Sequence, residues 1–121
     1  MSNVKFRYLY RDGSNYKNWA EIVFRNPEKL GTGNITEHLE KAFDDHLFIA
    51  RQIRIPEVFS FPDGEFTSDD HCYHEFYSVE ITDEAANDAE GRSIHLLLTQ
   101  VAEDARDGWR AYDRGTTLSS T

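Results

Sequence analysis

The sequence predicts an α+β fold: an antiparallel sheet of about four strands with two helices on one face, in the order β-β-α-β-β-α. Four short segments have strand-like apolar patterns bounded by turn residues, and two others repeat apolar residues at helical spacing. At 121 residues the chain has room for one ordinary core. We therefore expect a single domain over residues 1–115 and a flexible tail over residues 116–121.

The N-terminal segment predicts a β-hairpin. Residues Val4–Tyr10 and Trp19–Phe24 alternate between two faces and are rich in aromatic and β-branched side chains. Asp12 and Gly13 between them form a turn dipeptide, in which glycine accepts the positive φ that tight hairpins need. One face of the sheet is expected to stay open as a docking surface. Four charged residues are candidates to line it: Lys5, Arg7, Glu21 and Arg25.

The middle of the chain predicts a helix and then a strand. Asn34 followed by Glu37 matches a capping box, and apolar residues recur at helical spacing through Ile35–Asp45, where we expect the first helix. The segment Leu47–Ile55 predicts a third strand, because it has β-branched residues at its end and stops at Pro56, which cannot donate to a ladder.

The C-terminal part predicts a fourth strand and the clearest helix of the chain. Tyr73–Ile81 alternates again, whereas the acidic Thr82–Gly91 segment predicts a loop or a single helical turn. From Ile94 to Trp109 the apolar residues form one stripe at helical spacing. Ser93 stands at the position where a hydroxyl caps the free N–H groups of the first turn.

The negative charge is concentrated in the second half of the chain. The formal net charge is −9, and residues 57–107 hold fourteen acidic side chains against two basic ones. Such a segment attracts basic surfaces and repels phosphate backbones, so direct binding of nucleic acid is disfavoured. No Gly-rich phosphate loop or nucleophile motif is present, and the sequence predicts no catalytic residue and no cofactor.

The cell compartment is predicted from what the sequence lacks. No apolar run approaches the ~20 residues of a membrane helix, and no basic start followed by an apolar stretch indicates a secretory signal. The single cysteine, Cys72, has no internal partner for a disulfide, which is typical of a reducing compartment. We therefore expect a cytoplasmic protein without membrane contact.

The charge pattern predicts a small non-enzymatic module that binds a basic protein, for example one that itself handles nucleic acid. Such a module would act as an inhibitor or immunity-type protein and would mimic nucleic-acid phosphates. In size and charge alone the chain is similar to small acidic immunity and phage counter-defence proteins. The sequence does not decide between a monomer and a homodimer. The predicted partner-binding residues are Asp69, Asp70, Glu80, Asp83, Glu84, Asp88, Glu90, Glu103, Asp104 and Asp107.

Two other functions compete with this hypothesis. Four types of metal ligand fall within Asp69–Glu75, which favours a metal-dependent hydrolase with His71, Cys72 and His74 as candidate ligands. On a strand, however, Cys72 and His74 would point to one face and His71 to the other, and a structural site needs four ligands. The second competitor is an assembly subunit that dimerises through the open face of its sheet.

Overall fold

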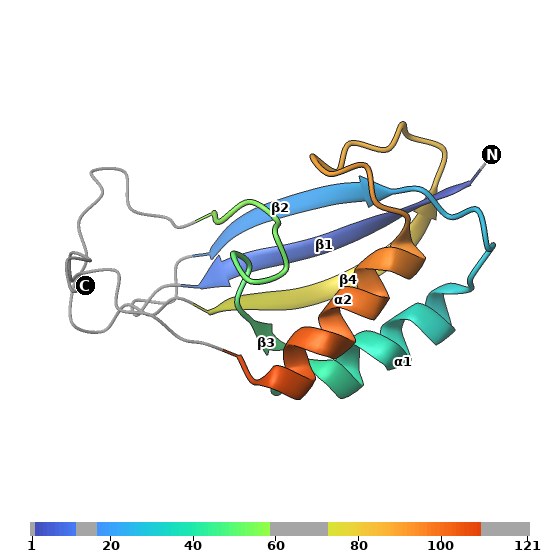
Figure 1. Ribbon diagram of the computed structural model, residues 1–121. Coiled ribbons are helices and arrows are strands. Elements are labelled where there is room, and N and C mark those ends of the chain that lie inside the picture. Colours follow the sequence, from blue (N-terminus) through green and yellow to red (C-terminus); the bar gives the residue numbers. More distant parts are fainter. Residues whose placement is uncertain (1, 12–16, 59–72, 110–121) are drawn as a thin grey trace.

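The computed structural model describes residues 2–11, 17–58 and 73–109. Its elements are β1 (Asn3–Arg11), β2 (Lys17–Phe24), α1 (Thr32–Ala42), β3 (Leu47–Phe48), β4 (His74–Thr82) and α2 (Ile94–Asp107). The strands form one curled antiparallel sheet in the order β2-β1-β4-β3, and both helices lie on the same side of it (Figure 1). The α+β class and the order of the elements are thus confirmed. The predicted turn at Asp12-Gly13 and the predicted tail lie outside the described residues.

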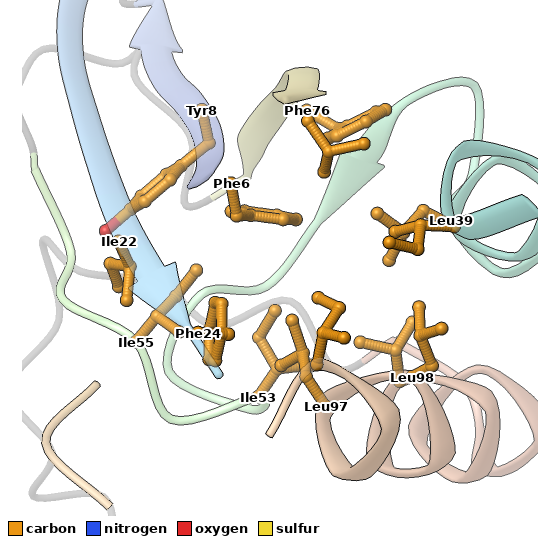
Figure 2. Packing of buried hydrophobic residues seen from close by; sticks show 14 of the residues in the cluster. Phe6, Tyr8, Ile22, Phe24, Leu39, Ile53, Ile55, Phe76, Leu97 and Leu98 are labelled. Atoms are coloured by element: carbon orange, nitrogen blue, oxygen red, sulfur yellow. The ribbon is translucent and has the colours of Figure 1, made fainter. Parts of the chain in front are cut away.

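The core fills the space between the sheet and the two helices (Figure 2). Alternate residues of β1 point into it, and the rings of Phe6 and Phe76 lie 5.5 Å apart at its centre. The helices contribute the apolar stripes that their spacing predicts: Ile35 and Leu39 from α1, and Ile94, Leu97, Leu98 and Val101 from α2. Burying a side chain of this size stabilises the fold by about 1.5–3 kcal/mol, so this layer dominates the free energy of folding.

Helix α2 begins after Ser93 as the sequence predicts, but it ends at Asp107, before the last residue of the predicted stripe, Trp109. The Ser93 side chain accepts a hydrogen bond from the Leu96 N–H, which satisfies one free donor of the first turn. At the other end, Gly108 adopts a φ of +97°, a conformation that side chains with a Cβ rarely tolerate. Trp109 lies beyond the helix, where its Nε1 donates to the Ala42 carbonyl and closes α2 onto α1.

The first helix differs from its prediction at both ends. It starts at Thr32 after Gly31, whose position has no side-chain cap, so the predicted capping box of Asn34 and Glu37 is wrong. It also ends before Asp45, because Phe43 leaves the helix in an extended conformation and turns into the core. The Phe43 ring stacks on Phe48 at 4.7 Å, an aromatic contact that continuing the helix would lose.

The predicted third strand, Leu47–Ile55, is wrong beyond its first two residues. Only Leu47–Phe48 pairs with β4, and residues 50–54 form turns that include Arg54 at a φ of +61°. Four apolar residues of this segment are buried without alternating: Ile49, Ala50, Ile53 and Ile55. Apolar residues at this spacing are compatible with either a strand or a packed turn, and here their side chains are buried without ladder pairing.

Within the described residues, neither helix is long and apolar enough to cross a membrane.

Candidate functional site: the open face of the sheet

The side of the sheet opposite the helices presents charged and aromatic side chains. We call this surface the open face and define it by Lys5 and Arg7 of β1, Trp19 and Glu21 of β2, Tyr77 and Glu80 of β4, and Glu84 of the following loop. The register brings them together, because Lys5 stands between Val23 and Glu80 and Arg7 stands between Glu21 and Ser78. Side chains at such cross-strand positions are neighbours. Three of the four residues expected on this surface, Lys5, Arg7 and Glu21, lie on it. The fourth, Arg25, follows the end of β2 and donates to the Gly91 carbonyl.

Three carboxylates share two cations on the open face. The Arg7 Nε lies 3.2 Å from Glu80 Oε2 and 3.5 Å from Glu21 Oε2. The Lys5 Nζ lies 3.5 Å from Glu21 Oε1 and donates a hydrogen bond to Glu84. The cluster therefore keeps one negative charge in excess, and the exposed Asp83 beside Glu84 adds another.

The hydrogen bond between Lys5 and Glu84 affects both ionisation equilibria. It raises the pKa of Lys5 above its usual value, against the opposing effect of burial and with help from the charge of Glu21. The same bond lowers the pKa of Glu84 below its usual value. Both groups are therefore held in their charged forms at neutral pH, which keeps the network ionic.

Two large aromatic side chains stand exposed beside this network. Trp19 and Tyr77 are 52% and 57% exposed, yet their ring centroids lie 4.9 Å apart in an edge-to-face contact. They come from β2 and β4, which flank β1 in the sheet, so the rings meet above the central strand. Together with Arg7, Ala20 and Glu21 they line a groove of about 290 Å³.

A β-bulge in β4 creates this arrangement. Arg7 pairs with Ser78 and Tyr8 pairs with Phe76, which leaves Tyr77 as the extra residue between them. Phe76 and Val79 both point into the core, so the bulge resets the alternation of the strand and directs Tyr77 outward. Bulges commonly redirect a side chain at a functional surface.

The predicted partner-binding carboxylates do not all meet at this surface. Glu80 and Glu84 lie on it with Asp83 nearby, whereas Glu90 pairs with Arg54 at 3.0 Å. Three others sit on the C-terminal half of α2, in the layer on the other side of the sheet: Glu103, Asp104 and Asp107. Asp69 and Asp70 lie outside the described residues.

Asp88 is an internal residue of the fold rather than a surface charge. Its side chain is 2% exposed, and both carboxylate oxygens accept hydrogen bonds of 2.9 Å from the buried Arg92 guanidinium. Arg92 also lies over the Phe24 ring at 5.8 Å. Its remaining N–H groups donate to the Ile53 carbonyl, the Arg54 carbonyl and Gln100 Oε1. All five donors of the guanidinium are thus satisfied, and the network joins the 83–92 loop, the 50–54 turns and α2.

The predicted metal cluster is only partly within the described residues. His74 is fully buried, packs against Tyr8 and Tyr10, and accepts the Val58 N–H through Nε2 at 2.9 Å. Glu75 pairs with Arg11. These contacts give His74 and Glu75 structural roles, and no group of three or more potential metal ligands occurs among residues 2–11, 17–58 and 73–109. His71 and Cys72 lie outside these ranges.

Two important residues are not apparent from the sequence pattern. The sequence alternation puts Trp19 on one of the two faces of its strand but does not tell which face is buried. The folded sheet shows that Trp19 lies on the exposed face. Arg92 stands four residues after Asp88, a spacing that signals an ion pair, although nothing local indicates its burial. Tyr77 is exposed on the open face, whereas Trp109 is packed against Phe43. No protein-family model, curated protein or solved structure matches this chain.

Proposed function

We propose that this chain is a small non-enzymatic protein-binding module that docks through the open face on a basic surface of another protein. The observation that carries the proposal is the exposed Trp19–Tyr77 pair beside three carboxylates, Glu21, Glu80 and Glu84. Aromatic side chains dominate the binding energy of protein interfaces, and surrounding charges give specificity and a fast association rate.

The charge balance of the open face supports a basic partner. Lys5 and Arg7 hold the carboxylates in place without neutralising them all, so a partner with Lys or Arg side chains meets an ordered negative surface. Basic surfaces of this kind are typical of proteins that bind nucleic acid. The module would then act as an inhibitor or immunity-type protein that occludes such a surface.

The first experiment is capture of partners from the source cell's lysate at low and at high salt, followed by purification of the captured protein. We expect a basic protein that is retained at low salt and released at high salt, because opposite charges across an interface are screened. Near-stoichiometric zinc or manganese in the untagged protein, lost on His71→Ala substitution, would contradict the proposal and favour the hydrolase.

The aromatic pair is tested with the purified partner. Replacing both Trp19 and Tyr77 with alanine should weaken binding by about 2 kcal/mol or more, which is about thirtyfold. Leu96→Ala is the matched control, since Leu96 is equally exposed at 52% but lies on α2 in the other layer. Equal binding by the double variant and the wild-type protein would refute the placement of the site.

The carboxylates are tested through the association rate. Glu80→Gln with Glu84→Gln should lower the rate several-fold at low salt and flatten its salt dependence. The control is Glu37→Gln with Glu40→Gln, which removes the same charge from exposed positions on α1. If the two double variants behave alike, net charge rather than the open face governs association.

A further inference from the structure

The outer edge of β2 carries main-chain groups that point away from the sheet. In an antiparallel ladder, alternate residues direct their N–H and C=O groups to the same side. Val23 shows which side this is: its N–H donates to Asn87 Oδ1 at 2.8 Å, and its carbonyl accepts from the Asn87 N–H at 2.9 Å. Lys17, Trp19 and Glu21 stand at even spacing from Val23, so their main-chain groups point outward as well.

Asn87 covers this edge only at its C-terminal end. There the 83–93 segment runs beside β2, while at the start of the strand the Asn18 side chain reaches the Val58 carbonyl (Figure 1). Lys17, Trp19 and Glu21 are exposed, and the described part of the chain supplies no acceptor or donor for their outward main-chain groups. An exposed strand edge of this kind is a template for another strand.

These three residues are complementary to themselves. A second, antiparallel copy of β2 related by a two-fold axis at Trp19 would place each Lys17 opposite Glu21 of the other copy. Trp19 would then face its own equivalent. All three positions have outward main-chain groups, so each facing pair exchanges two N–H···O bonds. Opposite charges and aromatic pairs at facing positions both stabilise an antiparallel ladder.

We propose that two copies of this chain join edge to edge through β2, about a two-fold axis at Trp19, into one continuous sheet. The interface uses the same strand of both copies, as the common isologous dimers do. The side chains of Lys17, Trp19 and Glu21 lie on the open face, so the two open faces become neighbours in the dimer. The proposal concerns the edge of the sheet and does not depend on the docking of a basic partner.

Sedimentation velocity over a range of concentrations tests the dimer. The wild-type protein should sediment at twice the 14.0 kDa of one chain. Lys17→Glu alone places two Glu residues opposite each other at both facing pairs, and Glu21→Lys alone does the same with two Lys residues. Each variant should raise the dimer dissociation constant by at least about tenfold. An equimolar mixture of the two variants restores opposite charges at both pairs and should form the heterodimer.

Two controls keep the result specific. Glu37→Lys changes the charge by the same amount as Glu21→Lys but lies on α1, and it should leave the dimer intact. Lys17→Pro removes an outward N–H at the first residue of an edge strand, where proline is tolerated, and should give a folded monomer by circular dichroism. A wild-type protein that stays monomeric, or a mixture that fails to dimerise, would overturn the proposal. The dimer proposal would also be overturned if the protein stayed monomeric and bound an extended basic peptide through this edge.

Discussion

Arg92 and Arg7 both contact carboxylates, but their surroundings differ. Arg92 is buried with Asp88, and every N–H of its guanidinium has a protein acceptor. The Arg7 side chain is 39% exposed and shares Glu21 and Glu80 with solvent around them. A buried pair that loses one member leaves an uncompensated charge, whereas an exposed pair is replaced by water at little cost. The comparison separates charges that hold the fold together from charges that remain available to another molecule.

Removing Arg92 should have the largest effect. Arg92→Ala leaves the Asp88 carboxylate buried without its cation and leaves the Ile53 and Arg54 carbonyls without their donor. We expect a loss of about 3–5 kcal/mol in the free energy of unfolding, measured by urea denaturation. Arg54→Ala is the control, because the Arg54–Glu90 pair is exposed and should contribute less than about 1 kcal/mol. Equal losses would show that burial does not distinguish the two networks.

The pH dependence of stability should also distinguish the buried Asp88 carboxylate from exposed ones, with a smaller effect than that of removing Arg92. Burial alone would raise the pKa of Asp88, but hydrogen bonds from the Arg92 side chain and main-chain N–H outweigh it and hold the pKa below its usual 3.8. The stabilisation is therefore complete above the unfolded pKa and is lost as the pH falls through the lowered folded value.

Asp88→Asn should flatten this acid loss and cost about 2 kcal/mol at neutral pH, since charge-assisted bonds to Arg92 are replaced by neutral ones. Thermal unfolding between pH 2 and pH 7 measures both quantities. Glu84→Gln is the matched comparison: its pKa is lowered too, but its side chain is mostly exposed, so the pH profile should stay close to wild type. A profile for Asp88→Asn that follows the wild-type curve would assign the acid loss to other carboxylates.

The smallest change is expected on the open face. Arg7→Ala should reduce the free energy of unfolding by less than about 1 kcal/mol, because both of its ion pairs are partly exposed and screened. The same variant should still alter partner binding, since Glu21 and Glu80 lose the cation that orders them. A loss as large as that of Arg92→Ala would place Arg7 among the residues that hold the fold together.

The sequence predicts an element well where its apolar and aromatic residues recur at a regular spacing. This holds for the presence and order of β1, β2 and β4, and for α2 with its stripe and its Ser93 cap. It predicts poorly where local chemistry and packing disagree. Asn34 and Glu37 look like a cap, but the helix starts at Thr32 after Gly31. The Leu47–Ile55 segment looks like a strand, but its apolar residues are buried in turns while Arg51 and Arg54 stay exposed.

The candidate site depends on long-range contacts and on strand register, which no local sequence pattern predicts. The carboxylates Glu80 and Glu84 are evident from composition, but their cations, Arg7 and Lys5, come from β1 at the other end of the chain. The bulge that exposes Tyr77 is a register shift between two strands, and register is set by the whole sheet. The sequence predicts Asp88 to be a surface charge because it lies in an acidic segment. In the fold its side chain is buried against Arg92.

The two-residue length of β3 limits how far the sheet can extend. β3 forms the edge of the sheet opposite β2, and it offers only Leu47–Phe48 as ladder residues. A chain with two long free strand edges can add copies head to tail and grow into a filament. A chain with one long free edge can pair that edge only once, with the same edge of a second copy. The asymmetry between β2 and β3 therefore favours a closed pair over open-ended polymerisation.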